Sequence, residues 1–188
     1  MSNENYKGKL LISSPEISDG LFDKSIVLIC EDDANGTMGF VLNKPLIDLS
    51  METIWTNIGY KKKNPYLTNK DVFIGGPLAS NAMFVIHSPE YFIDKKTIKV
   101  CEEISVTGTK EIIDDIQKGQ GPTKAIFLLG YSGWTPGQLE DEIMRDSWFL
   151  SEKFQSLIFS VDYQTKWTDA LLLIGIDPSK LSSYAGSS

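Results

Sequence analysis

Residues 125 to 144 constrain the fold of this chain more than any other segment. The apolar run from Ala125 to Leu129 predicts a buried strand. Gly130 and Gly133 follow, and glycine permits positive backbone angles or the close approach of another chain segment. In the stretch Thr135–Gln138, threonine suits the N-cap of a helix, proline its first turn, and glutamine completes a capping box. The segment therefore predicts a strand, a glycine turn and a capped helix.

Trp134 lies within this predicted turn and allows two interpretations. A strand that leads into a helix N-terminus could present backbone N–H groups to a bound anion. The same geometry could instead dock the indole ring into the core, which is the commoner use of a tryptophan in a turn. The sequence leaves both interpretations open.

Strands and helices mix along the chain without the regular alternation of a doubly wound sheet. Ser25–Cys30 and Thr37–Leu42 are strand-like and flank Asn35-Gly36, which predicts a hairpin, although the acidic residues 31–33 leave room for a longer loop. We also expect a helix over Ser50–Ile58 and a C-terminal helix over Trp167–Ile174. Residues 1–188 are predicted to form a single α+β domain, with flexible tails at residues 1–6 and 185–188.

Composition and charge exclude several classes of function. The 188 residues carry a formal net charge of −7, whereas a DNA-binding surface must be basic. Two isolated cysteines and a single histidine make neither a redox motif nor a zinc site, so we expect no metal and no cofactor. No apolar run reaches the length of a membrane span, and the N-terminus lacks the apolar core of a signal peptide, which together predict a cytoplasmic protein with no membrane partner.

No catalytic motif is present, so we expect no catalytic residues and lean against an enzyme. The residues that most resemble a ligand or partner site are polar, aromatic or glycine residues that lie at predicted strand ends. His87 is among them, and it is the only side chain with an ordinary pKa near neutrality. The candidate residues are Asn43, Gly75, Gly76, His87, Gly133 and Trp134.

Several ordered motifs together resemble the bacterial YqgE/AlgH family. They are Gly8-Lys9-Leu10-Leu11-Ile12, Ser25-Ile26-Val27-Leu28-Ile29, Gly39-Phe40-Val41-Leu42-Asn43-Lys44-Pro45, Phe73-Ile74-Gly75-Gly76-Pro77 and Gly130-Tyr131-Ser132-Gly133-Trp134-Thr135-Pro136-Gly137-Gln138-Leu139-Glu140. The resemblance covers roughly residues 7 to 175. Family members often carry a histidine near positions 31–33, whereas this chain has Glu31-Asp32-Asp33 there.

The resemblance implies a bifurcated, barrel-like mixed β-sheet with helices packed outside, in a bacterial cytoplasmic protein. The family is labelled as one of transcriptional regulators, without a settled biochemical activity. Because an acidic chain is unsuited to operator DNA, we expect an indirect regulator that acts through a protein partner or a small ligand. The alternative is a small-molecule-binding protein or enzyme whose cleft is built from the six candidate residues.

Overall fold

The computed structural model describes residues 5–47, 51–57, 70–152 and 154–181. The predicted cap Ser50, the helix end at Ile58 and the C-terminal tail lie outside these residues. Tyr6 belongs to the predicted N-terminal tail, yet its side chain is buried and its backbone N–H donates to Asp32 Oδ2 at 2.7 Å. The chain is therefore anchored before the first strand begins.

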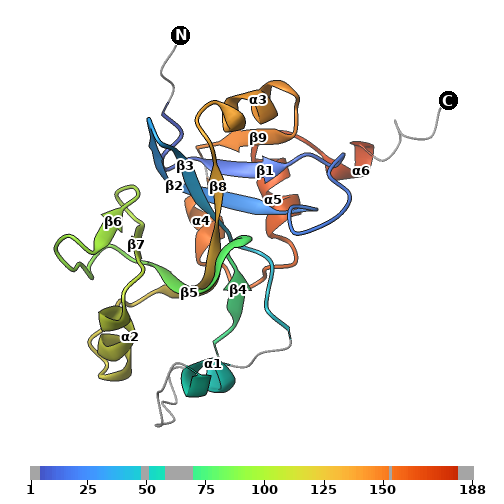
Figure 1. The fold of residues 1–188 in the computed structure, drawn as a ribbon. Coiled ribbons are helices and arrows are strands. Elements are labelled where there is room, and N and C mark those ends of the chain that lie inside the picture. The colour runs from blue at the N-terminus through green and yellow to red at the C-terminus, as the bar shows by residue number, and fades with distance from the viewer. Residues whose placement is uncertain (1–4, 48–50, 58–69, 153, 182–188) are drawn as a thin grey trace.

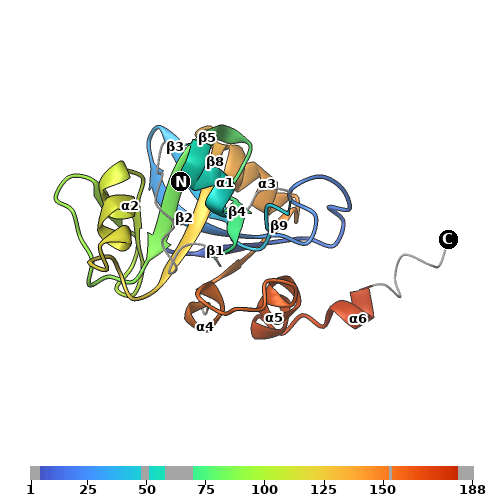
Figure 2. The same ribbon diagram turned by 90° about the horizontal axis from the view of Figure 1, so that it is seen from below.

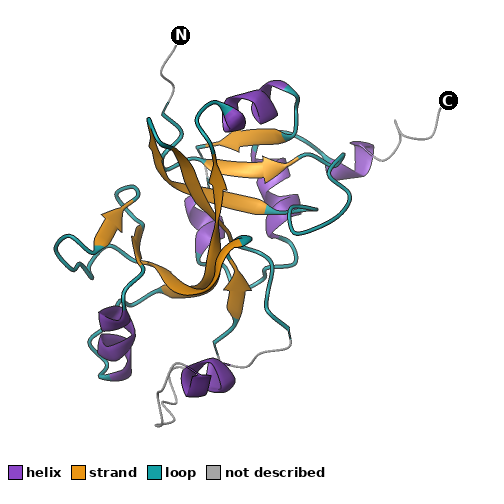
Figure 3. Ribbon diagram, viewed as in Figure 1, coloured by secondary structure: helices purple, strands orange, loops and turns teal. Residues whose placement is uncertain are grey.

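In the part of the chain that the structure describes, nine strands form one strongly curled sheet (Figures 1 and 3). Their order is β6-β7-β5-β8-β3-β2-β1-β9, and β4 pairs with β8 outside this path. The strands are β1 (Leu10–Ser13), β2 (Ile26–Asp33), β3 (Gly36–Val41), β4 (Val72–Ile74), β5 (Leu78–His87), β6 (Thr97–Lys99), β7 (Ser105–Thr107), β8 (Ala125–Trp134) and β9 (Trp148–Ser151).

The sheet divides at β8, which confirms the predicted bifurcated sheet. Along one edge of β8, β4 pairs in parallel with residues 127–129, and β3 pairs antiparallel with residues 132–134. Gly130 lies between the two pairings with a φ of 71°, a conformation that side chains with a Cβ rarely adopt. The prediction that the strand ends at Leu129 is wrong, because Gly130 bends the strand without ending its pairing. Trp134 is consequently the last residue of a strand.

The hairpin at Asn35-Gly36 is confirmed, although its first strand is longer than predicted. β2 continues through the acidic residues to Asp33, which pairs with Gly36. The register shifts between Ile29 and Glu31, so Cys30 lies in a bulge. Acidic side chains are tolerated there because Glu31 and Asp33 point to solvent on an edge of the molecule.

The described residues form six helices beside the sheet. They are α1 (Met51–Asn57), α2 (Lys110–Gln117), α3 (Gln138–Met144), α4 (Gln155–Ile158), α5 (Lys166–Leu173) and α6 (Pro178–Leu181). The predicted helix start at Thr135 is displaced, since α3 begins at Gln138 with Gly137 as its N-cap at a φ of 83°. One half of the predicted capping box still forms, because the Thr135 N–H donates to Gln138 Oε1 at 3.0 Å. None of the described helices is both long and apolar enough to cross a membrane.

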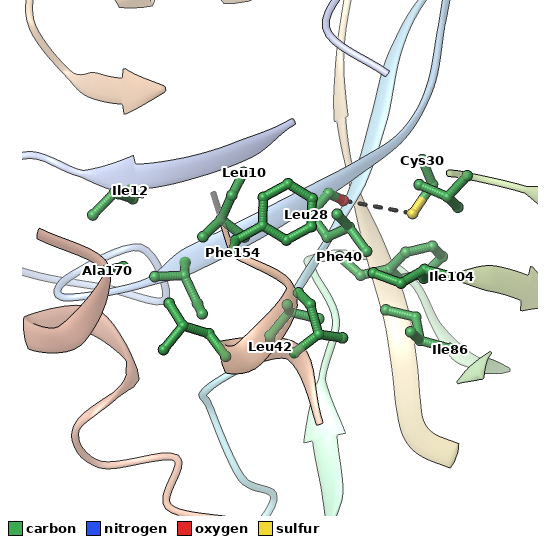
Figure 4. Packing of buried hydrophobic residues seen from close by; sticks show 14 of the residues in the cluster. Leu10, Ile12, Leu28, Cys30, Phe40, Leu42, Ile86, Ile104, Phe154 and Ala170 are labelled. Carbon is green, nitrogen blue, oxygen red and sulfur yellow. Dashed lines mark hydrogen bonds between the residues drawn. The ribbon is translucent and has the colours of Figure 1, made fainter. Parts of the chain in front are cut away.

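Helices α4, α5 and α6 form a layer on one face of the curled sheet (Figure 2). The largest core cluster fills the space between this layer and the sheet, and Figure 4 shows Leu10, Leu28, Phe40, Phe154 and Ala170 among its members. Val85 and Phe127 belong to a second cluster with residues of α1 and α2, and Val27 and Val41 to a third with residues of α3 and β9. The sheet is thus covered on both faces, which accounts for the unbroken apolar run in β2.

Candidate functional site

The six predicted site residues are spread along β8 and its neighbours. His87 pairs with Ala125 at the first residue of β8, and Trp134 is its last. At about 3.3 Å per residue, roughly 30 Å of strand separates these two ends. Neither of the two cavities described below is lined by any of the six residues. Their use as a ligand or partner site stays a prediction, and their contacts explain each of them locally.

The glycines at 75 and 76 allow two backbone segments to meet where the sheet divides. A Cβ on Gly76 would lie 2.0 Å from the carbonyl carbon of Tyr131, and one on Gly75 would lie 2.4 Å from the oxygen of Gly130. Gly75 also donates to Leu129 O and accepts from Val41 N, both at 2.8 Å. The pair therefore joins β3, β4 and β8 at one point, which no residue with a side chain could do.

Trp134 is a core residue tied down by a carboxylate. Its indole N–H donates to Glu142 Oε2 at 2.9 Å, and the indole N–H of Trp148 donates to the same oxygen at 2.8 Å. The two rings meet edge to face with centroids 6.1 Å apart. Gln138 donates to the other oxygen of Glu142 at 2.9 Å. Of the two interpretations of Trp134, the contacts support the structural one: α3 is fastened to β8 and β9.

His87 and Asn43 are both buried and hydrogen bonded. The ring nitrogens of His87 contact Ser88 O and Thr107 Oγ1, each at 2.9 Å. Burial lowers the pKa of His87, so the neutral ring is favoured. Asn43 accepts from Ile26 N at 3.0 Å and donates to Lys24 O at 2.9 Å, which closes the loop before β2. Gly133, the sixth candidate, is exposed and pairs with Met38 of β3.

The structure hollows the surface near the start of β8, at the end of the strand away from Trp134. A cavity of about 530 Å³ lies between the start of β8, the strand β4 and the helices α4 and α5, and a second of about 420 Å³ adjoins it. Both are lined by Lys70, Thr123, Ala125 and Phe127. Volumes in this range are typical of sites for small molecules. We take the larger hollow as the candidate site and call it the Lys166 cavity.

Lys166 is the unusual residue of this cavity. It lines the cavity, yet its side chain is only 2% exposed and ranks among the largest fully buried side chains. Its Nζ donates to Ile158 O at 2.8 Å, which ties the start of α5 to the end of α4. Among the residues that the structure describes, no carboxylate lies within ion-pair distance of this ammonium. Burial therefore lowers the pKa of Lys166 to about 8.

The rest of the cavity combines positive charge with apolar surface. Lys70 and Lys124 also line it, and Asp71 is its one lining carboxylate. The Nζ of Lys124 lies 5.6 Å from the centroid of the Phe159 ring, a cation–π contact. The apolar lining comes from Phe73, Ile126, Phe127 and Phe159. A chain with a net charge of −7 thus encloses a local excess of positive charge.

This arrangement suits an organic anion better than a metal ion. An ammonium supplies three N–H donors, of which Ile158 O takes one, so Lys166 retains donors for a ligand. Aromatic walls would bury an apolar body beside the anionic group. Within the described part of the chain, no three His, Cys, Asp or Glu side chains group so as to hold a metal.

Sequence reasoning missed this site. Lys166 sits next to Trp167 at the start of a predicted helix, a place where a lysine normally points to solvent. The sequence held a weak signal, because the position of a lysine in an amphipathic helix can be compared with the apolar stripe of that helix. The burial itself depends on α4 and on the start of β8, which are distant in sequence.

Comparison with known proteins assigns the chain to a family. A family described as AlgH-like, DUF179, matches residues 10–179. The chain belongs to the AlgH-like family. A UPF0301 protein of Cereibacter sphaeroides is 42% identical over 182 residues, covering 97% of this chain and 98% of the relative. A second UPF0301 protein, from Ruegeria pomeroyi, is 37% identical over 179 residues, covering 95% of this chain and 97% of the relative.

Solved structures agree with the fold. The solution structure of AlgH from Pseudomonas aeruginosa matches with a TM-score of 0.79 at 25% identity, over 100% of this chain and 98% of that one. The crystal structure of a Corynebacterium diphtheriae protein matches with a TM-score of 0.72 at 20% identity, over 91% of this chain and 88% of that one. These matches confirm the family resemblance and the predicted single α+β domain with a barrel-like sheet and helices.

Proposed function

We propose that this AlgH-like protein is a regulatory protein that binds a small organic anion in the Lys166 cavity and acts on transcription indirectly. One observation carries the proposal: a lysine buried to 2% exposure lines a cavity of about 530 Å³, and no described carboxylate, Asp71 of the same cavity included, forms an ion pair with it. An uncompensated buried ammonium destabilises a folded protein. A bound anion would supply the missing negative charge.

Charge supports an indirect mode of regulation. The net charge of −7 opposes association with the DNA backbone, so the regulatory role suggested by the family resemblance is better served by a ligand or a protein partner. In this proposal, anion binding at the α4–α5 junction changes the affinity of the protein for a protein partner.

Ligand-dependent stabilisation of the purified protein tests this function. The probes are 3-phenyllactate, which has a carboxylate and an aromatic body, and inorganic phosphate as a bare anion. A ligand that binds only the folded state raises the free energy of unfolding by about 3 kcal/mol at a hundredfold excess over Kd. The melting temperature rises with it. We expect a rise with phenyllactate that is lost in Lys166→Met.

The matched control is Lys99→Met, which removes an exposed lysine on β6 outside the cavity. This variant should respond to phenyllactate as the parent protein does. An equal loss of response in both variants would mean that the anion is attracted by overall charge and not by the cavity. The proposal would then be abandoned.

A further inference from the structure

Lys166 offers a second chemistry besides charge, because its amine is a nucleophile when it is neutral. A pKa of about 8 leaves a neutral fraction at neutral pH about two orders of magnitude above that of an ordinary lysine. Desolvated lysines of this kind form imines with carbonyl compounds. The desolvation is also evident from geometry alone, because the side chain of Lys166 is buried and forms part of a cavity wall.

The hydrogen bond of Lys166 orients the nitrogen for such a reaction. A neutral amine keeps two N–H groups and one lone pair. With one N–H donating to Ile158 O at 2.8 Å, the tetrahedral nitrogen directs its remaining N–H and its lone pair away from that carbonyl. Lys166 is part of the cavity wall, so a carbonyl compound bound in the cavity would approach the residue from that side.

The other lining residues select among carbonyl compounds. Lys70 and Lys124 provide positive charge for a carboxylate adjacent to the reacting carbon. Phe127 and Phe159 provide apolar walls for an aromatic or branched side chain. A 2-oxo acid with an apolar side chain carries these three features in one small molecule.

We propose that Lys166 binds an apolar 2-oxo acid covalently and reversibly, as an imine formed inside the Lys166 cavity. This inference rests on the proposed function, which requires only that the cavity binds an anion. The amine lone pair forms a C–N bond to the ketone carbon, and the resulting carbinolamine takes up a proton and loses its hydroxyl as water. The product is a cationic imine beside the ligand carboxylate. Nothing is oxidised or reduced, and hydrolysis returns both partners.

Reductive trapping tests the inference. The protein is incubated with phenylpyruvate and sodium cyanoborohydride, and the adducts are mapped by peptide mass spectrometry. We expect the adduct at Lys166 to exceed that at any exposed lysine by about tenfold or more, in line with its larger neutral fraction. The adduct at this position should be absent in Lys166→Arg, which keeps the charge, and in Lys166→Met, which does not. An excess of 3-phenyllactate should suppress trapping in the parent protein.

The outcomes separate the inference from the proposed function. Stabilisation by phenyllactate without an adduct at Lys166 would overturn the imine and leave anion binding intact. Uniform labelling of exposed lysines, with Lys166 unmodified, would overturn it in the same way. Absence of both stabilisation and adduct would overturn both.

Discussion

Replacing Lys166 with methionine should stabilise the protein at neutral pH. Methionine keeps the apolar stem of the side chain and removes the buried charge. Lowering a lysine pKa from 10.5 to about 8 corresponds to about 3 kcal/mol of lost stability while the group is charged in both states. The lost hydrogen bond to Ile158 O offsets about 1–2 kcal/mol of the gain. Lys166→Met should therefore be about 1–2 kcal/mol more stable than the parent protein at neutral pH.

The pH dependence of the stability difference gives a sharper measure, because the charge of Lys166 changes with pH whereas the hydrogen bond to Ile158 O stays. The pKa of Lys166 is lowered in the folded state. Below a pH of about 8 the side chain is charged in both the folded and the unfolded protein, so the full cost of burying the charge applies. Between about 8 and 10.5 the folded protein loses its proton before the unfolded chain does, and the penalty disappears. The stability advantage of Lys166→Met should thus shrink by about 2 kcal/mol between neutral pH and about pH 10.

Urea denaturation of both proteins across this pH range, followed by tryptophan fluorescence, measures the difference. Lys99→Met serves as the control, and its stability relative to the parent protein should not change in the same way. A difference between Lys166→Met and the parent protein that stays constant from neutral pH to about pH 10 would refute a desolvated ammonium at this position. The premise of the ligand proposals would fail with it.

Substitutions of Glu142, Gly76 and His87 test further contacts of the sheet and the helices. Glu142→Leu leaves two indole N–H groups without their acceptor and should lower the unfolding free energy by about 2–4 kcal/mol in urea denaturation, whereas Glu142→Gln keeps an acceptor oxygen and should lose less. Gly76→Ala places a Cβ 2.0 Å from backbone and should lower the melting temperature far more than Gly119→Ala, which meets nothing within 4 Å and carries only about 1 kcal/mol of strain from its φ of 74°. Because burial lowers the pKa of His87, the unfolded chain binds a proton first as pH falls below 6.5, so stability should decline there, and His87→Gln should show a shallower decline in the same assay.

Local sequence patterns predicted the secondary-structure elements that neighbouring residues determine. The hairpin at Asn35-Gly36 forms because the turn chemistry and the flanking apolar residues agree. The C-terminal helix forms close to its predicted bounds, as α5 from Lys166 to Leu173, because apolar residues recur at helical spacing and Gly175 follows at a φ of 81°. Prediction failed at Gly130 because a glycine that ends a strand and one that bends it have the same local sequence.

The composition of the chain and the order of its motifs were enough to predict one α+β domain and its family. They also pointed to the β8–α3 region, which carries the glycine at which the sheet divides and the tryptophan that fastens α3. These features belong to single residues and near neighbours, which is the information that a sequence states directly.

The candidate site was decided by tertiary structure alone. The burial of Lys166 requires α4, α5 and the start of β8 to meet, and its pKa is lowered because those elements exclude water from it. Likewise, the tertiary structure alone places His87 and Trp134 at opposite ends of β8 and brings the Trp134 indole N–H to Glu142. A sequence specifies which groups are available, but the distances between them, and hence their chemistry, arise when distant segments pack.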